Sequence, residues 1–96
     1  MIIYEVNLDV DKEIAKDFET WLKPHMQEVV SCGHFEKALS YQVEDPIKIL
    51  WTIHYHAKNR SLVETYLEEH APRLREEGLK KFGKKFRATR RILKQL

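Results

Sequence analysis

The sequence has only one cysteine, three glycines and three prolines among its 96 residues, and no long apolar run. The single cysteine, Cys32, cannot form a disulfide within the chain, so the composition does not point to an oxidising compartment. No apolar run is long enough to span a bilayer, and the first residues lack the pattern of a signal peptide. We therefore expect a cytoplasmic protein that has no contact with a membrane. The length predicts a single domain, residues 1–96.

Acidic residues are scarce in the second half of the chain. Residues 1–48 hold 10 acidic and 5 basic side chains, whereas residues 49–96 hold 5 acidic and 12 basic ones. The basic excess is concentrated after Arg73, in the C-terminal segment. Such a distribution is typical of an anion-binding surface, and equally of two surfaces of opposite charge that meet in a dimer.

Four segments alternate between apolar and polar residues and therefore predict β-strands. They are residues 2–10, 35–44, 47–57 and about 85–96. In the first and third of these, the alternation sends Tyr4, Trp51 and Tyr55 to one face of a sheet and Glu5 to the other. In the second, Phe35 is in phase with Leu39 and the apolar residues after it, so we expect these side chains to share a face.

Two segments carry apolar residues at a spacing of three to four and predict amphipathic helices. The first follows Asp11, a residue typical of a helix N-cap, and we expect Gly33 to end it. Pro24 lies inside this segment and is expected to kink or split the helix. The second helix is expected to begin at Ser61 as its N-cap, and Pro72 interrupts it.

The order β-α-β-β-α-β predicts an α+β, ferredoxin-like fold, a four-stranded antiparallel sheet with both helices on one face. The right-handed crossover rule places the first strand between the third and the fourth. The opposite face would carry a mixed set of side chains, which are Glu5, Leu50, Thr52, His54, His56 and Arg91. We expect two copies to pack through these faces into a dimeric α+β barrel, with these residues at the homodimer interface.

Four stretches of the chain are similar to one bacterial family. They are residues 1–6, 21–35, 66–77 and 81–93, and they read M-I-I-Y-E-V, W-L-K-P-H-M-Q-E-V-V-S-C-G-H-F, Y-L-E-E-H-A-P-R-L-R-E-E and K-F-G-K-K-F-R-A-T-R-R-I-L. In this order and at this spacing they resemble the domain-of-unknown-function family 4286. The resemblance implies a ferredoxin-like, dimeric α+β barrel and supplies no mechanism.

A wider similarity is to barrels of the antibiotic-biosynthesis-monooxygenase type, some of which degrade haem. Enzymes of that type carry an Asn on the first strand, an aromatic residue early in the second helix and a His about three turns later. Asn7 and Tyr66 are the counterparts of the first two, whereas this chain reads Glu76-Glu77-Gly78 where the His would stand. The resemblance implies Asn7 and Tyr66 as pocket residues and a weak monooxygenase-like activity as a third functional alternative.

Two aromatic–histidine pairs at helical spacing mark a candidate ligand site. His25 follows Trp21 by four residues and comes directly after Pro24, and His70 follows Tyr66 by four residues and precedes Ala71-Pro72. Residues four apart lie on one side of a helix, and a proline frees a backbone carbonyl one turn upstream. We predict that these side chains, together with Asn7, border a ligand pocket between the helices and the sheet. The alternative is that the aromatic rings belong to the core and that the histidines are solvated.

His54 and His56 share a strand face, and with Glu5 on the neighbouring strand they could form a divalent-metal site. Nothing in the sequence fixes a third ligand in place, so we favour polar contacts at an interface and expect no metal and no cofactor. Cys32 lies at the negative end of a helix, which raises the pKa of a thiol, and we interpret it as a structural residue.

Nucleic-acid binding is the remaining class, because RNA-recognition domains share this strand order. Residues 3–8 resemble their first-strand motif, but that alignment would place the charged Glu5 in the core. The third strand also lacks the Gly-Phe-rich signature that supplies the stacking rings in those domains. We therefore do not expect nucleic-acid binding.

Together these features predict a homodimeric barrel protein that binds a small, partly apolar or anionic molecule between its helices and its sheet. The alternative is a non-catalytic interaction module that uses the sheet face and the basic C-terminal segment. The sequence identifies no catalytic residue, and we favour a protein that is not an enzyme.

Overall fold

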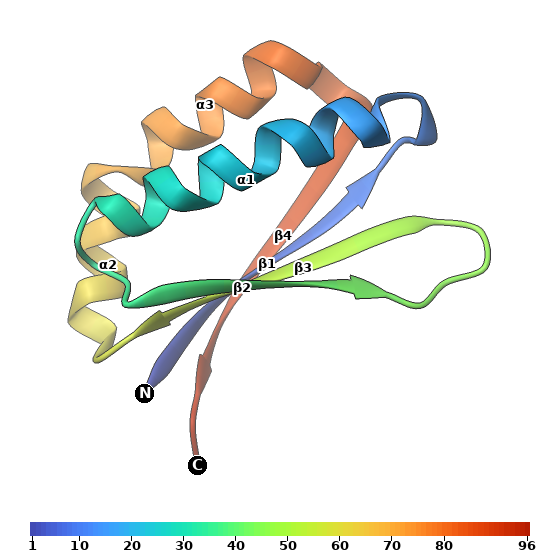
Figure 1. Ribbon diagram of the computed structural model, residues 1–96. Coiled ribbons are helices and arrows are strands. Elements are labelled where there is room, and N and C mark those ends of the chain that lie inside the picture. Colours follow the sequence, from blue (N-terminus) through green and yellow to red (C-terminus); the bar gives the residue numbers. More distant parts are fainter.

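One antiparallel sheet with the strand order β2-β3-β1-β4 forms the base of the computed structural model, which describes residues 1–96 (Figure 1). The strands are β1 (Ile2–Val10), β2 (Lys37–Val43), β3 (Ile49–Ala57) and β4 (Phe86–Lys94). The helices are α1 (Ala15–Ser31), α2 (Arg60–Glu69) and α3 (Ala71–Phe82), with short 3-10 turns η1 (Lys12–Ile14) and η2 (Gly83–Lys85). The predicted ferredoxin-like order is thereby confirmed, with β1 between β3 and β4.

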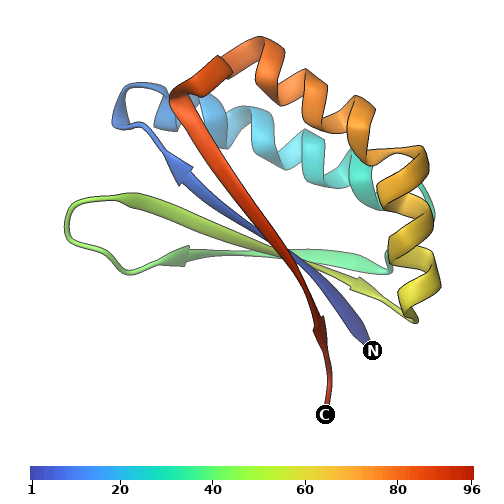
Figure 2. The ribbon, with the colours of Figure 1, turned by 180° about the vertical axis from the view of Figure 1, so that it is seen from behind.

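All three helices lie on the same side of the sheet. In Figure 1, α1 and α3 run next to each other above the strands and α2 lies at one end, and the view from behind in Figure 2 agrees. The opposite side of the sheet, called the open face below, has no element over it. None of the helices combines the length and the apolar character needed to cross a membrane.

The alternation of β1 and β3 positions the core between the sheet and the helices. Tyr4 is paired with Tyr55, and Leu8 is paired with Trp51, so these side chains lie together on the helix side of the sheet. Tyr4, Leu8 and Tyr55 are buried, as the sequence pattern predicts. Full burial of one such large side chain contributes about 1.5–3 kcal/mol to folding, so this face carries much of the stability.

Phe35 departs from the predicted pattern, because it does not share a face with Leu39. β2 begins only at Lys37, and the preceding segment bends so that Phe35 turns into the core. Its ring centroid lies 5.0 Å from that of Tyr66 and 5.3 Å from that of Tyr55. The prediction was wrong for Phe35, because an aromatic cluster formed by residues far apart in the sequence outweighs the local alternation.

The start of α2 also differs from the prediction. Ser61 lies inside the first turn, and the N-cap is Asn59, whose side-chain oxygen accepts a hydrogen bond from the Leu62 N–H at 3.0 Å. Asn59 has an extended backbone, with φ −152° and ψ 167°, which is the conformation of an N-cap residue. Asp11 begins the turn η1 but makes no side-chain cap bond there.

The two helix prolines have different effects. Pro24 lies within α1, which runs unbroken from Ala15 to Ser31. Pro72 lies in the first turn of α3, where the backbone N–H of a residue has no partner within the helix, so its absence in proline loses no hydrogen bond. The helical conformation is interrupted at His70, between α2 and α3. The second helical segment therefore forms two helices, and the break gives the junction a geometry that a continuous helix would not have.

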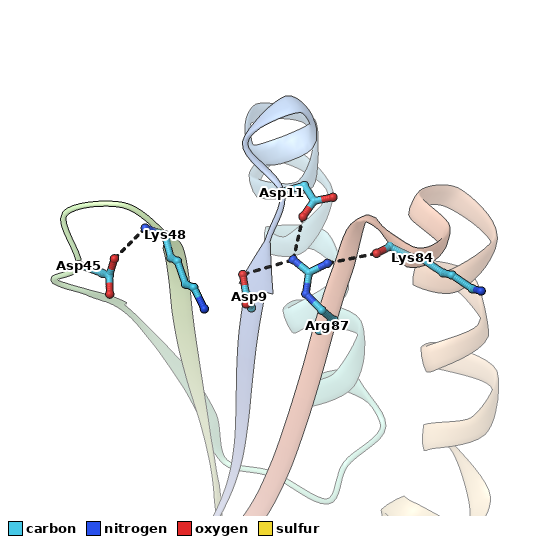
Figure 3. A network of polar contacts seen from close by, with 6 residues as sticks. All are labelled: Asp9, Asp11, Asp45, Lys48, Lys84 and Arg87. Atoms are coloured by element: carbon cyan, nitrogen blue, oxygen red, sulfur yellow. Dashed lines mark hydrogen bonds and ion pairs between the residues drawn. The ribbon is translucent and has the colours of Figure 1, made fainter.

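Arg87 ties the start of β4 to the end of β1, as Figure 3 shows. Its Nη2 donates to Asp11 Oδ1 at 2.7 Å and to Asp9 Oδ1 at 3.3 Å, and its Nη1 donates to the Lys84 carbonyl at 3.3 Å. These two hydrogen-bonded carboxylates raise the pKa of Arg87. In the β2–β3 turn of the same figure, Asp45 Oδ1 accepts from the backbone N–H of Lys48 at 2.7 Å.

Candidate functional site

A cavity of about 230 Å³ lies between the sheet and the helices α1 and α3. Eighteen residues line it, and fourteen of them are hydrophobic. The sheet contributes helix-side residues such as Val6 and Ile53, and the helices contribute Trp21, Leu74 and Gly78. A concave site with mostly apolar walls and a few polar groups is the usual form of a small-molecule site.

Two arginines and a tyrosine of this cavity come from three elements. Arg75 of α3 donates through Nη2 to the Tyr4 hydroxyl of β1 at 3.0 Å. Arg90 of β4 is paired with Val6 across the strands and so projects to the helix side of the sheet. Burial lowers the pKa of Arg90, the positive charge of Arg75 adds to that effect, and Tyr4 opposes it. Two guanidinium groups therefore lie near one phenol at the edge of an apolar space.

Arg75 and Arg90 are the only arginines that have no acidic partner. The other four each form an ion pair, which are Arg60–Glu64, Arg73–Glu28, Arg87–Asp11 and Arg91–Glu5. Both arginines line the cavity and are exposed to solvent, so their guanidinium groups are free to donate charge-assisted hydrogen bonds to an anion that binds beside them. The two unpaired arginines thus give the cavity a local excess of positive charge.

His25 provides a neutral polar group in the same cavity. Its ring lies against that of Trp21, with centroids 4.4 Å apart and an interplanar angle of 22°. Burial lowers the pKa of His25 below 6.5, and the nearby Glu28 opposes that shift only in part. The Nδ1 atom is buried and has no hydrogen-bond partner. At neutral pH this imidazole is uncharged and can exchange a hydrogen bond with a bound molecule.

Two tyrosines of the cavity, Tyr55 and Tyr66, keep their protons. Burial raises the pKa of Tyr55 and of Tyr66 well above the ordinary value for a phenol, and the neighbouring Tyr4 adds to the shift in both cases. Their hydroxyls are therefore neutral hydrogen-bonding groups rather than bases. The cavity can accordingly bind and orient a molecule, with His25, whose pKa is lowered by burial, as its only histidine.

Three of the five predicted ligand-site residues line the cavity, which are Trp21, His25 and Tyr66. His70 does not line it, because the helix break turns its ring toward His34, at a centroid distance of 5.2 Å. Asn7 belongs to the odd-numbered set of β1 and projects to the open face, where its Nδ2 donates to Glu5 Oε1 at 3.0 Å. The cavity residues Arg75 and Arg90 were not predicted.

A signal for Arg90 was present in the sequence. In β4 the helix-side positions are Phe86, Ala88, Arg90 and Ile92, so a charged residue occupies an otherwise apolar phase. Because the segment holds many basic residues, it is easily interpreted as a solvated surface, and the helix-side position of Arg90 is then overlooked. Arg75 has no such signal, since it lies in an ordinary polar run of α3.

The open face holds a hydrogen-bonded group around Glu5, whose residue is only 5% exposed. Arg91 Nε donates to Glu5 Oε1 at 2.5 Å, and His54 Nε2 lies 2.8 Å from Glu5 Oε2. The hydrogen bond from Arg91 lowers the pKa of Glu5 to about 2, and the bond from Asn7 adds to this effect, while burial opposes it. Glu5 is shielded from water by these partners and not by a second layer of protein.

The other residues predicted for the dimer interface also lie on the open face. Leu50, Thr52 and His56 share the phase of His54 along β3. The buried atoms Thr52 Oγ1 and His56 Nε2 have no hydrogen-bond partner. On β2, the open face carries Leu39, Tyr41 and Val43, which are 40%, 48% and 43% exposed.

The metal arrangement considered for Glu5, His54 and His56 does not form a cluster of ligands. Both oxygens of Glu5 are engaged, one by Arg91 and Asn7 and the other by His54. A different group, His34, Glu69 and His70, brings its ligand atoms within 4.8 Å of one another. Sequence reasoning missed it because His34 is 35 residues away from Glu69 in the chain.

The strand order, the helices on one face and the cavity beneath them define an α+β protein of the ferredoxin-like class. Solved structures of this class agree over the whole chain. One is a protein from Nitrosomonas europaea that is described as an antibiotic biosynthesis monooxygenase. It has a TM-score of 0.73 and 12% identity, and the match covers 100% of this chain and 99% of that chain. Another is the cofactor-independent oxygenase SnoaB from Streptomyces nogalater, with a TM-score of 0.71, 10% identity and coverage of 98% and 92%.

A third neighbour is a dimeric ferredoxin-like protein from an uncultured marine organism, with a TM-score of 0.61, 15% identity and coverage of 100% and 95%. At these identities the similarity extends to the fold alone. Among curated proteins, none has a sequence that matches this chain. The family model described as "Domain of unknown function (DUF4286)" matches residues 1–96, and the chain belongs to that family.

Proposed function

We propose that this protein binds a small organic anion with an apolar body in the cavity beneath α1 and α3. The observation that carries the proposal is the absence of any acidic partner for Arg75 and Arg90, both of which line the cavity. A carboxylate from a ligand would supply the missing counter-charge, and a guanidinium can hold it through two parallel hydrogen bonds.

The walls and the size of the cavity select the rest of the molecule. The apolar lining, which includes the aromatic side chains of Trp21 and Tyr66, favours a hydrocarbon or aromatic body. A closed apolar cavity of about 150 Å³ is known to hold one benzene molecule. The present volume of about 230 Å³ therefore fits a single substituted ring or a short acyl chain that carries one acidic group.

The proposal can be tested by titrating the protein with benzoate, phenylacetate and hexanoate while following the fluorescence of Trp21. The variant Trp51→Phe removes the second tryptophan, so the signal reports the cavity alone. We expect saturable binding of the acids, and binding at least about tenfold weaker for benzamide, because a hydrogen bond to a charged group contributes about 1.5–3 kcal/mol.

Matched variants separate the site from general charge effects. Arg90→Met and Arg75→Met should each weaken the binding of benzoate about tenfold or more. Arg60→Met is the control, because Arg60 is exposed on α2 and pairs only with Glu64. Equal affinities for benzoate and benzamide, or an equal loss in all three variants, would refute the proposal.

We also propose that two copies pair through their open faces. The support is the concentration of exposed apolar side chains there, Leu39, Tyr41 and Val43, beside buried polar atoms of Thr52 and His56 that have no partner. A neighbour of the same fold is described as dimeric. A second sheet would cover the apolar side chains and could supply the missing hydrogen bonds.

For location, we propose the cytoplasm. The support is compositional: Cys32 is the single cysteine and is a free thiol, as is usual in a reducing compartment. A non-catalytic interaction module, in which the open face forms the dimer and the basic C-terminal segment contacts a partner, is compatible with the proposed ligand, since the cavity and the open face lie on opposite sides of the sheet.

A further inference from the structure

We propose that His34, Glu69 and His70 form a binding site for a divalent transition-metal ion. Their ligand atoms, one ring nitrogen from each histidine and a carboxylate oxygen, all lie within 4.8 Å of one another. His34 lies in the turn that follows α1, Glu69 is the last residue of α2, and His70 is the residue between α2 and α3. The three ligands therefore come from two segments that are distant in the sequence.

The helix break explains how two consecutive residues can serve one ion. Neighbouring residues in a regular helix point in different directions and do not face each other. His70 leaves the helical conformation, with φ −122° and ψ −35°, so its side chain and that of Glu69 can converge. The backbone at this point is held on both sides, because the His70 N–H donates to the Tyr66 carbonyl at 2.9 Å and the His70 carbonyl accepts from the Leu74 N–H at 3.2 Å.

The turn after α1 supplies the third ligand. Gly33 has φ 91°, a left-handed conformation that L-residues rarely adopt, and it reverses the chain so that His34 faces the helix junction. The rings of His34 and His70 have centroids 5.2 Å apart. The proximity of the two imidazoles is thus fixed by the fold at a glycine and a helix break, and not by a flexible loop.

None of these side chains is committed to another partner. His34 Nδ1 is buried and has no hydrogen bond, and Glu69 takes part in no ion pair. His54, by contrast, is engaged by Glu5 on the open face. A buried imidazole nitrogen without a partner is unfavourable, and coordination of a metal would satisfy it.

The donor set indicates the kind of ion. Two imidazoles and one carboxylate favour Zn²⁺ and the other late first-row divalent ions over Mg²⁺ or Ca²⁺, which prefer oxygen ligands alone. Bond lengths of about 2.0–2.2 Å place the ligands of a tetrahedral zinc roughly 3.4 Å apart. Rotation of the exposed Glu69 side chain and of the two imidazole rings would bring the present separations, all within 4.8 Å, to that value. Three protein ligands leave a fourth position for water or an external ligand.

This site is distinct from the cavity, since none of its three residues lines the cavity. The nearest connection is Tyr66, a cavity residue whose ring centroid lies 6.3 Å from that of His70. The metal proposal therefore stands or falls independently of the proposed binding of an organic anion.

The test uses the full chain without a histidine tag, treated with a chelator and then titrated with Zn²⁺ in competition with a chromophoric chelator. We expect one Zn²⁺ per chain and, with Co²⁺, the intense visible absorption of a four-coordinate site. Glu69→Gln should weaken Zn²⁺ binding at least about tenfold, since even the loss of a group behind a ligand costs that much. Glu68→Gln is the matched control, because it changes the adjacent exposed carboxylate of the same helix and should bind within about twofold of the parent.

Melting curves give a second measurement. Zn²⁺ at a hundredfold excess over its Kd should raise the melting temperature of the parent chain by roughly 10 °C, and of Glu69→Gln by much less. His34→Asn should lose binding as well, while circular dichroism checks its fold. The double variant His54→Gln/His56→Gln should bind as the parent does. Undiminished binding by both Glu69→Gln and His34→Asn, or a loss confined to the His54/His56 variant, would overturn the proposal.

Discussion

His54 of β3 and Glu5 of β1 are joined across adjacent strands on the open face, with His54 Nε2 2.8 Å from Glu5 Oε2. Arg91 approaches the same carboxylate from β4, on the other side. Glu5 thus links the three strands β3, β1 and β4 by side-chain bonds in addition to the backbone ladder, and it remains ionised over almost the whole pH range.

Glu5 makes the stability of the protein depend on acid. The pKa of Glu5 is lowered from 4.5 to about 2 in the folded chain, so its contribution is fully present above pH 4.5 and is lost as the pH falls through 2. We expect Glu5→Gln to lower the free energy of unfolding at pH 7 by about 1–2 kcal/mol. This is less than the full pKa shift implies, because the partners of Glu5 are partly exposed and solvent screens their charges. Urea unfolding at pH 7 and pH 2 should show the difference between parent and variant shrinking in acid. An unchanged difference at both values would contradict this account.

Trp21 should report the titration of His25. Burial lowers the pKa of His25 below 6.5, so the folded chain resists protonation that the unfolded chain accepts, and folding loses stability as the pH falls below 6.5. A protonated imidazole stacked on an indole quenches its fluorescence. In Trp51→Phe we expect the emission of Trp21 to fall with a midpoint below pH 6.5 before the chain unfolds. The control is the additional change His25→Gln, which should remove that transition, whereas its persistence would assign it to another group.

Leu50 lies at the β2–β3 hairpin end of the proposed dimer interface, on the open face opposite Val43 of β2. Leu50→Glu places a charge where two apolar faces would meet, and we expect sedimentation to show monomers at concentrations where the parent chain is dimeric. Ile47→Glu is the matched control, because Ile47 lies in the β2–β3 turn and is 71% exposed. A dimer that survives Leu50→Glu would place the contact elsewhere.

The cap of α2 can be tested by two neighbouring substitutions. Asn59→Ala removes the hydrogen bond to the Leu62 N–H and should lower the free energy of unfolding by about 1 kcal/mol. Ser61→Ala removes a side chain that caps nothing and should change it by less than about 0.5 kcal/mol. Urea denaturation measures both. A larger loss of stability in Ser61→Ala than in Asn59→Ala would identify Ser61 as the N-cap.

Gly78 allows α3 to approach α1 closely. A Cβ at this position would lie 3.1 Å from Cη2 of Trp21, so the indole must shift by a few tenths of an ångström in Gly78→Ala. Alanine also favours the helix by about 1 kcal/mol relative to glycine, so we expect little net loss of stability. The emission of Trp21 should change and the binding of benzoate should weaken, while Glu76→Ala on the exposed side of α3 leaves both unchanged. An emission spectrum of Gly78→Ala identical to that of the parent chain would show that the added methyl group does not displace the indole.

The alternation of residues is sufficient to predict the fold and the two faces of β1 and β3. Tyr4 and Tyr55 are buried where the pattern places them, because a strand has no other way to divide apolar and polar side chains. Phe35 could not be placed in this way, since its position is decided by rings from three other elements. Contacts between residues far apart in the chain produce no pattern in the sequence around Phe35.

The candidate sites are predictable only in part for the same reason. Trp21 and His25 could be paired because helical spacing brings them together. The apolar phase of β4 marks Arg90 in the sequence, but the lack of an acidic neighbour for Arg75 and Arg90 is a property of the folded chain. His34 and His70 meet because a glycine and a proline redirect the backbone, and a sequence pattern gives the positions of such residues but not the distance that results.

The margins of the sheet have a consequence for assembly. β2 and β4 are its outer strands, so each has one side of its backbone without a strand partner. On β4 this margin carries Arg87, Arg90, Arg91 and Lys94 within nine residues. If β4 of another copy paired with this β4, the basic side chains of the two strands would lie close together. Their repulsion disfavours growth of the sheet by addition of strands. Pairing of two copies through their open faces would leave this margin uncovered, and its basic side chains disfavour further growth of the sheet along β4.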